Sequence, residues 1–125
     1  MTKSNFELVK DFHTAMNLKI GSEPKLPTKK EWEHRQKLIN DELLEWNDSI
    51  QNRETRNSAK ELADVLYTVY GAAVEQGIDI DTVFRIVHAS NMGKLGDDGK
   101  PTYREDGKIM KGPNYKPPDL NWIKK

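Results

Sequence analysis

Apolar residues recur at three- and four-residue spacings in four stretches of the chain, the period of an amphipathic helix. We expect helices over residues 4–16, 28–51, 58–76 and 79–94. Ser4 and Thr28 are suitable N-caps for the first two, and Glu31, three residues after Thr28, completes a capping box. Gly77 is placed to end the third helix. The pattern predicts an all-α helical bundle built on a long antiparallel helix hairpin.

The segments outside these helices have a different composition. Residues 17–27 carry a glycine and two prolines and are typical of a loop, and Asp79 or Asp81 can cap the fourth helix. Residues 96–118 contain four glycines and four prolines, and Asp106-Gly107 is a dipeptide preferred in type I′ turns. We therefore predict a single domain over residues 1–125. It consists of a helical core over 1–95 and an irregular C-terminal flap over 96–125 with room for a small β-hairpin.

The charge balance excludes some functions. Twenty basic and twenty acidic residues give a formal net charge of zero, so neither nucleic acid nor a membrane is an expected partner. No apolar run approaches the length of a membrane span or resembles a signal peptide, and cysteine is absent, which indicates a cytoplasmic protein. Charged residues make up 32% of the chain, and this polar composition favours a homodimer or homotetramer that completes the core.

The two long helices each combine an apolar stripe with displaced carboxylates. In the second helix the stripe, about 60° wide, is expected to be core and consists of Trp32, Ile39, Leu43, Trp46 and Ile50. The third helix has a matching stripe of Leu62, Val65, Leu66, Val69 and Ala73. Glu42 and Glu45 lie to one side of the first stripe, and Glu61 and Asp64 lie to the same side of the second. Antiparallel packing would bring all four carboxylates to one edge of the pair.

Four carboxylates at close range need a positive charge among them, because like charges raise one another's pKa. Oxygen ligands without sulfur suit magnesium, with manganese as a substitute, and these ions also bind phosphates. Glutamates are common on solvated helix faces too, so the geometry alone leaves that ordinary interpretation open.

The motifs then resemble a known family. The segment Asp41–Glu45, reading Asp-Glu-Leu-Leu-Glu, and the segment Glu61–Asp64, reading Glu-Leu-Ala-Asp, are similar to the paired motifs of the MazG-like all-α nucleoside triphosphate pyrophosphohydrolases. The similarity continues through residues 66–71, 88–95 and 111–115. The resemblance implies a helical bundle around magnesium in which water releases a nucleoside monophosphate and pyrophosphate. It also implies four metal ligands, which are Glu42, Glu45, Glu61 and Asp64.

One position departs from the family pattern. Asp41 stands where the family commonly has a glutamate that positions or deprotonates the attacking water, and aspartate is one methylene shorter. Asp41 and Glu42 are thus the catalytic candidates, although a solvated Asp41 is an equally acceptable interpretation.

Basic and aromatic residues near the C-terminus are candidates for binding substrate. Asn91 and Lys94 share a helix face at i, i+3 and can hold phosphate or sugar, although a lysine near a helix C-terminus is also favoured by the helix dipole. Lys108 and Lys111 in the flap can close over a triphosphate, and Tyr115 can stack on a base.

The expected function is metal-dependent hydrolysis of a ribo- or deoxyribonucleoside triphosphate in nucleotide-pool control. The alternative is a noncatalytic, oligomeric helical module that binds nucleotide or metal. Glu31-x-x-His34 also invites a di-iron bundle, but that architecture needs two such motifs and this chain has one.

Overall fold

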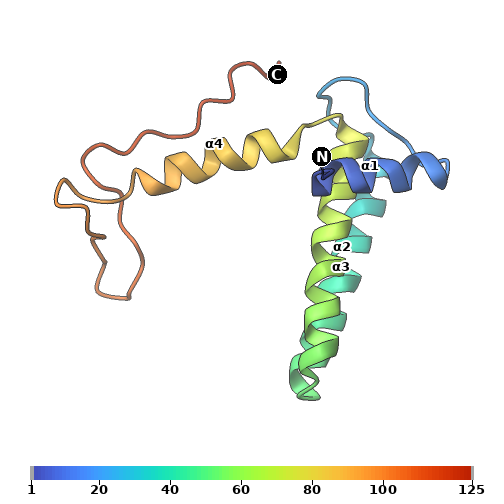
Figure 1. Cartoon of the computed structure of the whole chain (residues 1–125), viewed down its shortest axis with the longest axis horizontal. Coiled ribbons are helices and arrows are strands. Elements are labelled where there is room, and N and C mark those ends of the chain that lie inside the picture. The colour runs from blue at the N-terminus through green and yellow to red at the C-terminus, as the bar shows by residue number, and fades with distance from the viewer. Residues whose placement is uncertain (1, 125) are drawn as a thin grey trace. The chain divides into compact units, whose positions relative to one another are not determined.

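The computed structural model describes residues 2–124 and is all-α, as the sequence predicts (Figure 1). Its helices are α1 (Asn5–Ala15), α2 (Lys29–Gln51), α3 (Thr55–Gln76) and α4 (Ile80–Met92). The chain is organised as two compact units, Met1–Ile80 and Asp81–Lys125. The single domain expected over residues 1–125 stays a prediction.

The starts of α1 and α2 are fixed by capping boxes. The Thr28 hydroxyl accepts a hydrogen bond from the Glu31 amide at 3.2 Å, and the Thr28 amide donates to Glu31 Oε1 at 2.8 Å. Ser4 and Glu7 make the same reciprocal pair at α1. Each box satisfies two backbone amides that the first turn would leave unpaired, so both helices begin where the sequence predicts.

The connection between α2 and α3 is shorter than predicted. We expected α3 to begin near Ser58, but it begins at Thr55 after a three-residue link. Arg53 takes a left-handed conformation with φ 55°, and the Glu54 amide donates to the Ser49 carbonyl at 3.0 Å. With this backbone geometry the chain reverses direction within the three residues of the link. Residues 55–57, which we expected to belong to the turn, are therefore part of α3.

The ends of α3 and α4 are set by backbone conformation. Gly77 ends α3 in the left-handed region with φ 69°, as predicted, and a Cβ there would lie 2.4 Å from the Glu23 carbonyl oxygen. In contrast, α4 ends at Met92, two residues earlier than expected. Of the two residues predicted to cap α4, Asp81 lies inside its first turn, whereas Asp79 directly precedes the first helical residue, Ile80.

The first unit is a helix hairpin with α1 packed across one end. In Figure 1, α2 and α3 run side by side, and α1 crosses them near the C-terminal end of α3. The buried apolar residues in the described part of the chain are Val9, Ala73 and Val74, joined by buried His13, Ser49 and Glu61. The hairpin therefore closes on a narrow, partly polar interior.

The prediction that the two apolar stripes form the core is only partly correct for the single chain, in which Ala73 is buried but most stripe residues are not. Trp32 and Ile50 are each 53% exposed, and Leu62 and Leu66 are also exposed. Ser49 of α2 and Glu61 and Gly71 of α3 are buried instead, and much of the stripes lies on the surface.

The second unit consists of α4 and the irregular segment that follows it. Ser90 of α4 donates from its hydroxyl to the Lys116 carbonyl at 2.7 Å, so the segment returns along the helix. Within it, an antiparallel bridge pairs Tyr103 with Ile109. The turn is not type I′, because that turn needs positive φ at both central residues and only Gly107 of Asp106-Gly107 has it.

No helix within residues 2–124 combines the length and the apolar character needed to cross a membrane.

Replacing Thr28 by alanine removes the capping acceptor of α2. We expect Thr28→Ala to lower the free energy of unfolding by about 1 kcal/mol, the usual cost of losing such a cap. Thr55→Ala is the matched control, because Thr55 begins α3 without serving as its cap. Chemical denaturation of both variants measures the difference, and equal stability losses would contradict the capping role.

Candidate metal centre

The hairpin brings four carboxylates together. One carboxylate oxygen from each residue lies within 4.8 Å of the others, and the residues are Glu42 and Glu45 of α2 and Glu61 and Asp64 of α3. Each pair is spaced i, i+3, which places its members on one helix face. The short link after α2 sets the two faces opposite each other, so residues about twenty positions apart share one site.

Two of these carboxylates have oxygens that no protein group satisfies. Glu61 is only 5% exposed, and within residues 2–124 neither its Oε2 nor that of Glu42 has a hydrogen-bond partner. Burial raises the pKa of Glu42 to about 7, and contact with Glu45 and the charges of Asp64 and Glu61 add to the rise. Unsatisfied buried anions of this kind are costly unless a cation joins them.

A lysine that sequence reasoning missed lies against this cluster. Lys60 Nζ is 2.8 Å from Asp64 Oδ2 and 3.2 Å from Glu61 Oε1. Hydrogen bonds to Asp64 and then Glu61 raise the pKa of the lysine. The signal was present in the sequence, since Lys60 and Asp64 are spaced i, i+4, the distance at which helical ion pairs form.

The donor set fits a hard divalent cation. All four side chains offer oxygen, the chain has no cysteine, and no histidine within residues 2–124 belongs to the cluster. Magnesium and manganese prefer such oxygen ligands. Together with the unpaired oxygens of Glu42 and Glu61, this composition means that the cluster can hold a metal ion.

Asp41, the other catalytic candidate, is adjacent in sequence but lies outside the four-carboxylate group. Its Oδ2 is 2.6 Å from Lys37 Nζ on the preceding turn of α2, and its side chain is about half exposed. The carboxylate is therefore paired within α2 and open to solvent.

The candidate substrate-binding residues all belong to the second unit. Lys94 lies beyond the end of α4, so the expected shared helix face with Asn91 is wrong, although the Lys94 amide donates to the Asn91 carbonyl at 3.1 Å. Lys111 and Tyr115 are brought together, with Nζ 4.9 Å from the ring centroid in a cation–π contact. The Lys108 amide donates to Asp106 Oδ1 in the turn.

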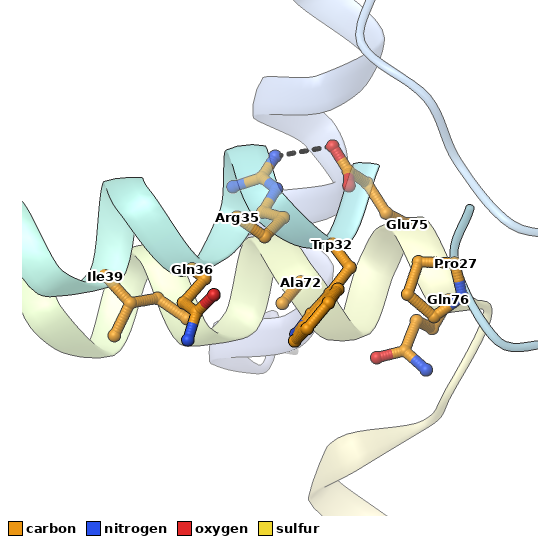
Figure 2. A pocket seen from close by; sticks show the side chains of 8 residues that line it. All are labelled: Pro27, Trp32, Arg35, Gln36, Ile39, Ala72, Glu75 and Gln76. Carbon is orange, nitrogen blue, oxygen red and sulfur yellow. Dashed lines mark hydrogen bonds and ion pairs between the residues drawn. The ribbon is translucent and has the colours of Figure 1, made fainter. Parts of the chain in front are cut away.

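A second polar group links α1 to the hairpin. Figure 2 shows Arg35 of α2 directed at Glu75 of α3, and Arg35 Nη2 donates to Glu75 Oε1 at 2.9 Å. The same nitrogen is 3.4 Å from His13 Nε2, so His13 Nδ1, 2.9 Å from the Lys19 carbonyl, is assigned as the donor there. Arginine can only donate hydrogen bonds, so the Arg35 guanidinium contacts both the Glu75 carboxylate and the Nε2 atom of His13.

A cavity of about 210 Å³ opens beside this group. It is lined by Pro27, Trp32, Arg35, Gln36, Ile39, Ala72, Glu75 and Gln76 (Figure 2). No local pattern in the sequence indicates the Arg35–Glu75 pair, because the two residues are forty positions apart.

Comparison with known protein families identifies the class to which this helix hairpin with paired Glu-x-x-Glu and Glu-x-x-Asp carboxylates belongs. Residues 9–91 match the family model described as phosphoribosyl-ATP pyrophosphohydrolase. The chain belongs to this family, which confirms the resemblance stated from the motifs.

The chain is also similar to solved structures. No curated protein matches the chain. Among solved structures, a candidate NTP pyrophosphohydrolase from Exiguobacterium sp. 255-15 is similar at 24% sequence identity. The match covers 94% of this chain and 90% of that one, with a TM-score of 0.45.

The raised pKa of Glu42 predicts how stability depends on pH in chelator. Because the folded-state pKa is about 7 against an ordinary value of 4.5, the folded protein holds the proton more tightly than the unfolded chain. The free energy of unfolding should therefore fall as pH rises from about 4.5 to about 7. Denaturation across this range measures the fall.

Glu42→Gln should flatten this pH dependence, because the glutamine cannot ionise. Glu33→Gln, an exposed α2 substitution, should retain the wild-type slope. Identical slopes in wild type and Glu42→Gln would refute the assignment of the titration to Glu42.

Proposed function

We propose that the protein hydrolyses a nucleoside triphosphate to the nucleoside monophosphate and pyrophosphate, using magnesium held by Glu42, Glu45, Glu61 and Asp64. Membership in a pyrophosphohydrolase family supports the reaction class. The observation that carries the metal assignment is the cluster itself, in which four carboxylate oxygens converge and two buried oxygens lack a partner.

The reaction joins a water oxygen to the α-phosphorus and breaks the bond from that phosphorus to the oxygen bridging the β-phosphate. Pyrophosphate leaves with the bond electrons, and the attacking water gives up a proton. Bound magnesium supplies charge neutralisation on the phosphates and lowers the pKa of water.

The protein's own groups have separate roles in this proposal. Asp41 accepts the proton of the attacking water, and its partly exposed carboxylate is accessible for that purpose. Asn91, Lys94, Lys108 and Lys111 bind phosphate or sugar, and Tyr115 stacks on the base. The Lys111–Tyr115 contact supports a joint role, since it presents a cation and an aromatic face together.

The nucleotide preference is also part of the proposal. We favour a ribo- or deoxyribonucleoside triphosphate and a role in nucleotide-pool control, from the motif resemblance. The matched family is named for phosphoribosyl-ATP, so that compound is a second substrate for direct comparison. A cytoplasmic location stays a prediction from the sequence.

We also propose a homodimer or homotetramer. The exposed apolar residues of α2 and α3 include Trp32, Leu43, Ile50, Leu62 and Leu66. Such residues are scattered singly on most monomers, but here they follow the stripes of two adjacent helices. A second copy packed on these stripes would bury them and complete the core that the single chain lacks.

The first test is pyrophosphate release from a panel of nucleoside triphosphates and phosphoribosyl-ATP, with magnesium, manganese or chelator. We expect metal-dependent release, with a monophosphate product identified by chromatography. Glu42→Gln should reduce release to the level seen in chelator, because it removes an anionic ligand. Glu33→Gln, on the exposed part of α2, should keep wild-type turnover.

Other outcomes separate the alternatives. Full activity in Glu42→Gln would refute the site assignment. No turnover of any compound, with metal binding intact, would instead favour the noncatalytic nucleotide- or metal-binding module.

The oligomer proposal has its own test. Light scattering after size-exclusion chromatography should give two or four times the mass of one chain. Leu66→Lys should shift the protein toward the monomer, because it places a charge on the proposed interface, whereas Leu66→Met should leave the assembly unchanged. A wild-type monomer at micromolar concentration would overturn this part.

A further inference from the structure

Lys60 approaches the carboxylate cluster from the solvent side. Its own side chain is 63% exposed, whereas that of Glu61 is 6% exposed and that of Asp64 is 35% exposed. The ammonium nevertheless reaches both carboxylates, at 3.2 Å from Glu61 Oε1 and 2.8 Å from Asp64 Oδ2. The long side chain thus brings one positive charge to the edge of the four-carboxylate group.

Lys60 pairs with some oxygens of the cluster and leaves two buried ones without a partner. Glu61 Oε1 and Asp64 Oδ2 are held by the ammonium, whereas Glu61 Oε2 and Glu42 Oε2 have no partner within residues 2–124. One ammonium therefore neutralises only part of the charge. A divalent cation drawn to the unpartnered oxygens would meet the ammonium on two of its four prospective ligands.

We propose that Lys60 is a tethered counter-ion of this centre, which a divalent cation must displace from Asp64 and Glu61 in order to bind fully. The inference rests on the proposed function, because it takes the cluster to be the metal site. A carboxylate oxygen that accepts hydrogen bonds from an ammonium is a poorer metal ligand, and the two cations repel each other across a few ångströms. Lys60 thereby lowers the metal affinity of the site.

The Lys60 side chain can leave the carboxylate cluster for solvent. Because Lys60 is mostly exposed, it can swing into water on metal binding at little cost in burial. It also stabilises the metal-free chain, since it offsets repulsion among carboxylates that would otherwise face one another without a cation. The same residue accordingly supports the metal-free state and opposes the metal-bound one.

The test is a calorimetric titration with Mn²⁺ of the wild type, Lys60→Gln and Lys29→Gln. Lys29 is the matched control, because it is an exposed lysine paired i, i+4 with Glu33 and its loss changes the net charge equally. We expect Lys60→Gln to bind Mn²⁺ about 1.4-fold to fivefold more tightly, the range for a solvent-screened charge pair. Its unfolding temperature in chelator should fall below that of the wild type.

Displacement gives a second readout that does not depend on affinity. With lysines labelled by ¹³C reductive methylation, the Lys60 resonance, identified by its absence from Lys60→Gln, should move on Mg²⁺ saturation while the Lys29 resonance stays in place. Lys60→Arg, which keeps the charge, should bind Mn²⁺ no more tightly than the wild type.

The outcomes separate the two proposals. Equal Mn²⁺ affinities for wild type and Lys60→Gln, or a Lys60 resonance that ignores Mg²⁺, would overturn the role of Lys60 and leave the metal centre standing. Absence of Mn²⁺ binding in every variant would refute the metal centre itself, and the role of Lys60 with it.

Discussion

Repulsion among four carboxylates held between two helices is the constraint on which this structure depends. Most side chains that close a helix hairpin are apolar, but here Glu61 is among the most buried residues of α3. Around Glu61, burial of apolar surface therefore contributes little to the stability of the interface between α2 and α3. The buried negative charge there destabilises the folded chain. Capping, the short link and the polar contacts at the other end of the hairpin must hold the helices in place against it.

The contacts among Arg35, Glu75 and His13 help to keep the helices of the first unit together. They lie toward the end of the hairpin where α1 crosses, and their charges are matched, whereas those of the carboxylate cluster are not. The two polar groups thus differ in kind. In the Arg35–Glu75 group, the partly buried carboxylate has its cation within the protein. In the carboxylate cluster, two buried carboxylate oxygens are left for a ligand from outside to satisfy.

Much of the fold could be predicted from the sequence, because its signals are local. Thr28 with Glu31 and Ser4 mark helix starts through bonds made within one turn, and Gly77 marks an end through its own backbone preference. The convergence of Glu42 with Glu61 followed from helical geometry together with the direction of the hairpin. The exposure of the apolar stripes could not be predicted in this way. Periodicity shows that Trp32 and Ile50 share one helix face, but it does not show whether the same chain or another molecule packs against that face. The ion pair of Arg35 with Glu75 was missed for a similar reason, because it depends on tertiary packing.

The three-residue link between α2 and α3 has a consequence for how such a protein can change over evolution. Arg53 is in a left-handed conformation and the Glu54 amide donates a hydrogen bond to the Ser49 carbonyl, so the backbone of the link is fixed in a tight turn. One added residue that extended α3 would turn the helix by about 100° and shift it by about 1.5 Å, which would move Glu61 and Asp64 out of alignment with α2. Length variation among relatives should therefore collect in the loop before α2 and in the segment after α4, while this link keeps a constant length.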